Sequence, residues 1–432
     1  MAINLISFLG VSNYLPVQYS HGDVLSDFTP YIQVALAQFN FAELSKPGAS
    51  VSILMTEQAK IKHWDIEGGL AQALRGILPT ASIEEVIIPE LKNEEQLWEI
   101  FDKMFEIIPK NAEVILDITH GYRSMPLLGA VILDYARSLK HIKVQGIHYA
   151  AVEAKQGDIV PIVDLSKLDR LFRWNRAVEL FIRGGDASGL EDLMGETARD
   201  ADKEAKLGQS LPAERRLCSN LRQAYELLTT ARGEEICYGE PFLVATRTLD
   251  ELTVAGGFAS PMRPLYNLIR SRVSSFRKDS LSNLLYAISM CINYRLTQQG
   301  ITLLQESIIT ILLFIHNLDA AGRNQREAVS KYFRYLFRNN DSIINPREEE
   351  KFFDIIEALE LDPLCESLGV AFNALRDLRN NINHAGFTLA QPRPDRFEKA
   401  LKEQFIATLT ALAEHSEFKE ACGLLLEKHK KT

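Results

Sequence analysis

Short runs rich in β-branched residues alternate with segments of helical spacing in the first third of the chain. The runs occupy residues 3–9, 51–55, 85–88, 114–118 and 144–149. Between them, residues 97–108 place apolar side chains at intervals of three and four, which is the spacing of one helix face. Alternating strands and helices over about 150 residues predict a Rossmann-like domain with a doubly wound, mostly parallel sheet.

The pattern becomes helical beyond residue 165. An amphipathic helix is expected over 168–183, and the small and polar stretch 184–216 is interpreted as a mobile connection or as a pair of surface helices. Further helices are predicted at 217–230, 280–293, 301–317, 323–337, 351–359, 370–383 and 397–426. The predicted organisation is an α/β domain over 1–165, a helical linker or insertion over 166–280, and an all-α helical bundle over 281–432.

Composition narrows the class of protein. A chain of 432 residues is too long for a single hydrophobic core, so more than one domain is expected. A net charge of −9 excludes a strongly basic nucleic-acid binder. The five cysteines are scattered without a Cys-x-x-Cys pair, which indicates reduced thiols. The first residues lack the basic region of a signal peptide, and the longest apolar stretch, 308–315, is shorter than a membrane span. We therefore expect a soluble, cytoplasmic protein with no membrane partner.

Residues 117–126 (DITHGYRSMP) follow the fourth run and lead into a helix. Helix N-termini bind phosphate because their N–H groups are unpaired and their dipole is positive. Gly121 lets a ligand approach the backbone closely, Arg123 offers a bidentate phosphate contact, and Ser124 can cap the helix. The candidate ligand-binding residues in this segment are Thr119, His120, Gly121, Arg123 and Ser124.

Two other loops are predicted at the same edge of the sheet, because ligands of such folds lie beyond the carboxyl ends of the strands. The loop after the first run and the start of the loop after the second contribute Gly10, Ser12, Asn13, Tyr14 and Thr56. Tyr14 carries a ring that can stack on a base. The sequence has neither Gly-x-Gly-x-x-Gly nor a Walker motif. Capped turns without a ligand are the alternative, and three loops at one edge favour a pocket.

Residues 375–386 (LRDLRNNINHAG) end the helix predicted at 370–383. Three asparagines are unfavourable inside a helix, and they lie between Arg379 and His384. An arginine and an imidazole are what metal-free RNA cleavage needs, since one stabilises phosphoryl charge and the other moves a proton. The alternative is a histidine placed favourably on the helix dipole with asparagines as caps. The residues alone favour this alternative.

The combination of motifs resembles a known family. A doubly wound domain with Asp-Ile-Thr-His-Gly-Tyr-Arg after its fourth strand, followed by a helical domain with Arg-Asn-x-x-x-His, is similar to the CARF–HEPN ribonucleases of type III CRISPR systems. The resemblance covers both ends of the chain and leaves about 184–232 without a counterpart. It implies that 1–165 is a CARF domain and that 281–432 is a HEPN domain.

The resemblance also implies the function. The CARF domain would bind a cyclic oligoadenylate, cyclic tetra-adenylate by first choice or cyclic hexa-adenylate, and activate an endoribonuclease that uses neither metal nor cofactor. A homodimer, with a larger assembly left open, would cut single-stranded RNA to 2′,3′-cyclic phosphate and 5′-hydroxyl ends. Arg379 and His384 would be the catalytic pair, supported by Asn380. The activator pocket would include Ser12, Asn13, Thr119, His120, Gly121 and Arg123.

Two other functions stay open. A regulator could sense the same ligand and bind nucleic acid without cleaving it, through a basic cluster near Arg270. A ring nuclease could instead degrade the messenger with help from Thr119 or His120. A metal-dependent nuclease is disfavoured, because the sequence shows no clustered acids and no histidine pair at ligand spacing.

Overall fold

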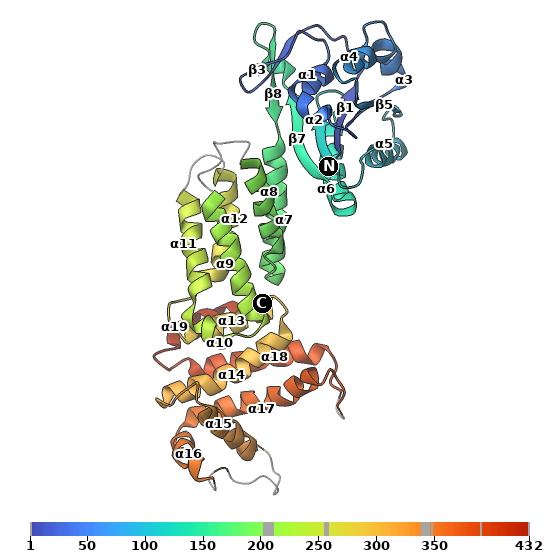
Figure 1. The fold of residues 1–432 in the computed structure, drawn as a ribbon. Coiled ribbons are helices and arrows are strands. Elements are labelled where there is room, and N and C mark those ends of the chain that lie inside the picture. The colour runs from blue at the N-terminus through green and yellow to red at the C-terminus, as the bar shows by residue number, and fades with distance from the viewer. Residues whose placement is uncertain are drawn as a thin grey trace. The chain divides into compact units, whose positions relative to one another are not determined.

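The computed structural model describes residues 2–201, 211–254, 259–337, 346, 349–388 and 391–430. The chain divides into two compact units, Met1–Phe172 and Arg173–Thr432. The division falls inside the helix α7, Ser166–Gly184 (Figure 1). The boundaries expected after residues 165 and 280 stay predictions, and the first lies at the start of α7.

A twisted sheet forms the first unit. Within the described residues its eight strands lie in the order β3-β2-β8-β7-β6-β1-β4-β5. The strands are β1 (Ile3–Leu9), β2 (Gln18–His21), β3 (Val24–Leu25), β4 (Ser50–Met55), β5 (Ser82–Ile87), β6 (Glu113–Asp117), β7 (Lys143–Ala150) and β8 (Ile159–Asp164).

The prediction of a parallel sheet is confirmed for the five strands that the sequence pattern identified. β7, β6, β1, β4 and β5 pair in parallel, each with its neighbour. The other side of the sheet is mixed: β8 runs antiparallel to β7, β2 is parallel to β8, and β3 is antiparallel to β2. These three strands were not predicted.

Helices cover both faces of this sheet, which makes it doubly wound (Figure 1). On one face pack α1 (Ile32–Phe39), α2 (Phe41–Leu44) and α4 (Leu70–Ile77), and on the other α5 (Glu94–Glu106) and α6 (Met125–Lys140). The central strand β1 sends Leu5 and Leu9 into the first core and Ile6 and Phe8 into the second. Burial on both faces explains why this strand is an almost continuous apolar run.

The second unit is helical, as predicted. Its helices beyond α7 are α8 (Ser188–Ala201), α9 (Leu211–Thr229), α10 (Gly233–Tyr238), α11 (Glu240–Val254), α12 (Ala259–Val273), α13 (Ser282–Asn293), α14 (Thr297–Ile315), α15 (Arg323–Phe337), α16 (Phe353–Glu360), α17 (Pro363–Asn383), α18 (Asp395–Leu412) and α19 (Lys419–Lys430).

Two predictions about these helices need correction. The stretch 184–216 contains α8 and the start of α9, so it fits the helix pair better than a connection without structure; residues 202–210 lie outside the described part. The single helix expected over 397–426 is two helices, because the chain turns between α18 and α19 around the buried Phe418.

The helix α14 runs through the core of this unit. By length and composition alone it is the one described helix that could cross a membrane, and 61% of that stretch is buried inside the protein. Its apolar character therefore extends well beyond the stretch 308–315. A core helix of a soluble protein passes the same test of length and composition, so these two properties are weak evidence that α14 spans a membrane.

Candidate ligand pocket and candidate nuclease centre

A pocket of about 330 Å³ lies at the carboxyl ends of β1, β4 and β6. The loops after these strands line it, together with Phe8, Leu9, Val11, Leu54, Ile88 and Tyr122. Of the candidate residues, the structure brings seven together there: Gly10, Ser12, Tyr14, Thr56, Thr119, His120 and Gly121. Asn13, Arg123 and Ser124 are not among the lining residues. The pocket is where a parallel doubly wound sheet places its ligands.

The buried carboxylate of Asp117 fixes the loop after β6. It accepts hydrogen bonds from Ser7 Oγ at 2.6 Å, from the Thr119 amide at 2.9 Å and from Thr119 Oγ1 at 2.5 Å. Thr119 Oγ1 also accepts from the amide of Ala150 at 2.9 Å. The Thr119 hydroxyl is therefore engaged by the protein on both sides. Burial raises the pKa of Asp117, and the hydrogen bonds from Ser7 and Thr119 reduce this rise because they favour the charged carboxylate.

Tyr14 lies between the loops and contacts two imidazoles. Its ring centroid is 4.5 Å from that of His120 and 4.7 Å from that of His63. Its hydroxyl accepts a hydrogen bond from the Gly10 amide at 2.9 Å, and burial raises its pKa to about 12. The ring predicted to stack on a base is thus already packed against protein rings.

His120 is held as a neutral imidazole. Burial lowers its pKa from 6.5 to about 4, and the nearby His63 adds to the effect. Its Nε2 atom is buried without a hydrogen-bond partner in the described part of the chain. An unpaired buried nitrogen at a pocket wall is a point where a ligand's polar atom would find a partner.

A turn of π-helix, Lys60–Trp64, supports the loop after β1. None of its residues was among the predicted ligand-binding residues. Lys62 Nζ donates to the Val11 carbonyl at 2.6 Å, and His63 Nε2 donates to the Ser12 carbonyl at 2.8 Å. Single π turns occur frequently at functional sites. Nothing in the spacing of these residues marked them, because the period of the turn becomes visible only in the folded backbone.

Four of the candidates have local structural roles or exposed side chains. Thr56 caps α3 (Glu57–Ala59) by accepting from the Ala59 amide at 3.3 Å. Ser124 occupies the N-cap of α6, but its side chain makes no capping hydrogen bond, so the expectation that it caps the helix is wrong. Arg123 and Asn13 have exposed side chains.

The candidate nuclease residues lie at the end of α17. His384 is the C-cap, and its amide donates to the Asn380 carbonyl at 3.0 Å. The side chains of Asn380 and His384 are exposed, whereas Arg379 is partly buried and turns toward α14. In the described residues no hydrogen bond joins the three side chains, and their common role stays a prediction. Gly386, with φ +79°, follows the helix end as expected for a C-terminal stop.

One of the intervening asparagines has a structural explanation. Asn381 is 8% exposed, and its Nδ2 donates to Thr388 Oγ1 at 2.6 Å. This contact ties the end of α17 to the residues that follow it.

The described residues contain no group of three or more histidines, cysteines or acids that could hold a metal ion.

Comparison with known proteins gives the family of the first unit. Residues 4–153 match the family described as the CARF domain of the CRISPR system endoribonuclease Csx1. The first unit is a CARF domain. The chain is also 30% identical over 126 residues to the CRISPR-associated protein MJ1674 of Methanocaldococcus jannaschii, which covers 28% of this chain and 20% of that protein.

The matched residues contain every residue that lines the CARF pocket. The chain spans only about a fifth of the curated relative it matches. Both the family match and the pocket concern the CARF domain, and the helical unit follows it. The family assignment therefore concerns the first unit, and the family match ends before the helical unit begins.

Proposed function

We propose that this chain is a sensor of cyclic oligoadenylate that acts as a metal-independent endoribonuclease in type III CRISPR defence. The observation that carries the sensing half is the CARF pocket at the ends of β1, β4 and β6. It combines apolar walls, a glycine with positive φ and an unpaired imidazole nitrogen, which suit a base and a phosphate. A homodimer would present two such pockets to a ligand that has its own two-fold symmetry.

Cleavage in this proposal belongs to Arg379, Asn380 and His384. The ribose 2′-hydroxyl attacks the adjacent phosphorus, His384 carries a proton between the reacting oxygens, and Arg379 stabilises charge on the phosphoryl oxygens. The products are a 2′,3′-cyclic phosphate and a 5′-hydroxyl. The exposure of His384 and Asn380 supports a composite site, because these side chains are accessible to RNA and to a second protomer.

The test is cleavage of a fluorophore–quencher RNA by the full chain in EDTA, with and without cyclic tetra-adenylate. We expect activator-dependent cleavage that survives EDTA and falls by at least about 10²-fold in His384→Ala, since proton transfer contributes about 10²–10⁴-fold. The matched control is Asn383→Ala, which changes an exposed neighbour on the same helix end and should leave the rate unchanged.

Each outcome separates the parts of the proposal. Equal rates with and without activator would remove the allosteric control. Loss of cleavage in EDTA would replace the chemistry with a metal-dependent one. If neither cyclic tetra-adenylate nor cyclic hexa-adenylate gave cleavage while one of them bound, measured by calorimetry, the protein would be a sensor without nuclease activity.

A further inference from the structure

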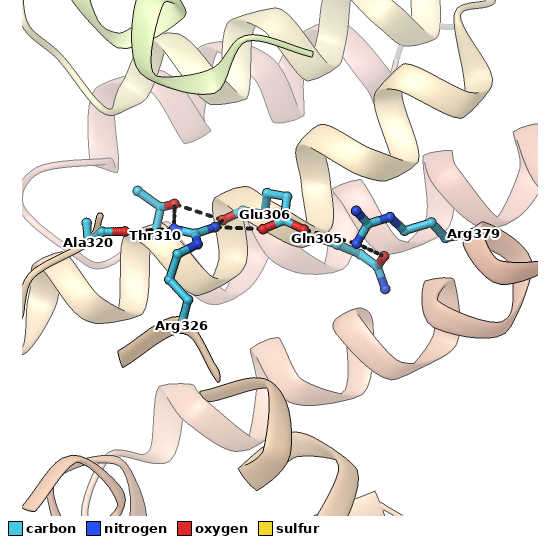
Figure 2. Close-up of polar contacts among 6 residues, drawn as sticks. All are labelled: Gln305, Glu306, Thr310, Ala320, Arg326 and Arg379. Atoms are coloured by element: carbon cyan, nitrogen blue, oxygen red, sulfur yellow. Dashed lines mark hydrogen bonds and ion pairs between the residues drawn. The ribbon is translucent and has the colours of Figure 1, made fainter. Parts of the chain in front are cut away.

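Glu306 on α14 bridges two arginines of the helical unit (Figure 2). Its Oε1 atom accepts from Arg379 Nη1 at 3.0 Å, and its Oε2 atom accepts from Arg326 Nη2 at 2.7 Å. Arg379 comes from α17 and Arg326 from α15, so one carboxylate joins three helices. The sequence had marked Arg379 alone among these three residues as a site residue.

Arg326 is anchored independently of Glu306. Its Nη1 atom donates to the Ala320 carbonyl at 2.8 Å and to Thr310 Oγ1 at 2.9 Å. A planar guanidinium held on both of its terminal nitrogens has little freedom to move. It therefore fixes the carboxylate of Glu306 in one orientation.

Among the residues that the structure describes, the hydrogen bonds of Arg379 all use one nitrogen. Its Nη1 atom contacts Glu306 and, at a long 3.5 Å, Gln305 Oε1; the Gln305 amide is itself anchored on the Phe372 carbonyl at 2.9 Å. Its Nε atom is buried without a partner in the described residues, and the contacts shown for Arg379 leave Nη2 unused (Figure 2). Nη2 thus remains available for an oxygen of a phosphate.

The charge balance of this cluster favours anion binding. Two guanidinium groups and one carboxylate carry a net charge of +1, since Glu306 is already shared with Arg326. Glu306 therefore holds Arg379 without cancelling its positive charge. A carboxylate that belonged to Arg379 alone would instead compete with a phosphate.

We propose that Glu306 is a positioning residue for Arg379, and that Arg326 acts through it. This inference rests on the proposed nuclease function. Glu306 aims Arg379 at the phosphoryl oxygens, and a misplacement of about 1 Å in such a group costs about 10²-fold in rate. The RNA itself does not contact Glu306 in this arrangement.

The first variant is Glu306→Gln, which keeps the size of the side chain and removes its charge. At saturating activator we expect kcat to fall about 10- to 100-fold, with little change in the KM for RNA and in the unfolding transition. The matched control is Glu357→Gln, an exposed glutamate on α16, which should behave as wild type. Arg326→Lys should also lower kcat, although Arg326 does not touch Arg379.

The second measurement separates positioning from mere packing. Guanidinium ion at millimolar concentration should restore part of the activity of Arg379→Ala, because Glu306 would bind it where the side chain was. The variant Arg379→Ala/Glu306→Gln should show no rescue. Rescue that is equal in both variants would overturn the inference.

The remaining outcomes distinguish this inference from the proposed function. A wild-type chain inactive with every activator would overturn both. An active wild type with an unchanged kcat in Glu306→Gln would overturn the positioning role alone. A higher rate of Glu306→Gln without activator would show that Glu306 restrains Arg379, which also contradicts positioning.

Discussion

At the scale of residues, the CARF pocket depends on side chains whose polar atoms are mostly committed to the protein. The hydroxyls of Thr119 and Thr56 hold their own loops, and Tyr14 OH accepts from the Gly10 amide. His120 differs, because its buried Nε2 finds no hydrogen-bond partner within the described ranges. Keeping this imidazole neutral lowers the stability of the folded protein by an amount that grows as the pH falls.

The free energy of unfolding should decrease as the pH is lowered, because His120 is buried in its neutral form. The folded protein holds its pKa near 4, below the 6.5 of an exposed histidine, so the unfolded chain binds more protons between these values. The free energy of unfolding therefore decreases as the pH drops from about 6.5 toward 4. We expect this residue to account for about 1 to 2 kcal/mol between pH 7 and pH 5.

Urea unfolding of the wild type and His120→Asn at pH 7 and pH 5 measures this contribution. The variant should lose less stability on acidification than the wild type. His141→Asn is the matched control, because His141 is exposed at the end of α6 in a left-handed conformation that asparagine tolerates. Equal losses in wild type and His120→Asn would contradict the buried neutral state.

At the scale of elements, the junction between β6 and α6 shapes the pocket through its backbone. Gly121 has φ +116°, a conformation that side chains rarely adopt. A Cβ atom there would also lie 3.2 Å from Met125 Cγ and 3.3 Å from Phe8 Cβ. The loop can therefore pass close to β1 only because this residue is glycine.

Gly121→Ala should lower the free energy of unfolding by about 1 to 3 kcal/mol, since both backbone strain and close contact act against it. Chemical denaturation followed by circular dichroism measures the change. The comparison is Gly76→Ala in α4, where a Cβ would meet nothing within 4 Å. That substitution should stabilise by about 0.5 to 1 kcal/mol, because alanine favours the helix. A Gly121→Ala protein as stable as wild type would contradict the strain at this junction.

The sequence predicted those elements whose burial follows a simple period. β1 was predicted with its observed bounds, because both faces of this central strand are buried. β2, β3 and β8 were missed, since β2 and β3 are short and the pairing of β8 with β7 depends on residues far apart in sequence. Glu306 was missed because it stands in an apolar helix and gains its partners only when α15 and α17 pack against α14.

At the scale of the whole molecule, the two units carry the two halves of the proposed function. The pocket belongs to the CARF domain and Arg379 to the helical unit. Any effect of the activator on the affinity for RNA is then expressed by a coupling free energy between two distinct sites. Such coupling acts equally in both directions when it concerns binding.

RNA should tighten the binding of activator by the factor by which activator tightens the binding of RNA. An RNA with a 2′-O-methyl group at every position lacks the attacking hydroxyl, cannot be cleaved, and serves as the probe. Calorimetry should give a lower Kd for cyclic tetra-adenylate in its presence, by about 5- to 150-fold if the coupling is of ordinary size. His384→Ala, which removes the proton carrier and not the interface, should keep the effect. An activator Kd that ignores RNA while activator changes the RNA Kd would contradict a two-site linkage.

The π turn at Lys60–Trp64 has an evolutionary consequence. Such a turn holds one residue more than the α-helical turn it replaces, so losing one residue would restore an α-helical turn and shift the side chains that the turn carries. Lys62 and His63 would then leave the carbonyls of Val11 and Ser12. A single codon deletion outside the pocket lining could thus reshape the wall made by the loop after β1, and give a lineage a new ligand preference without a substitution in the pocket itself.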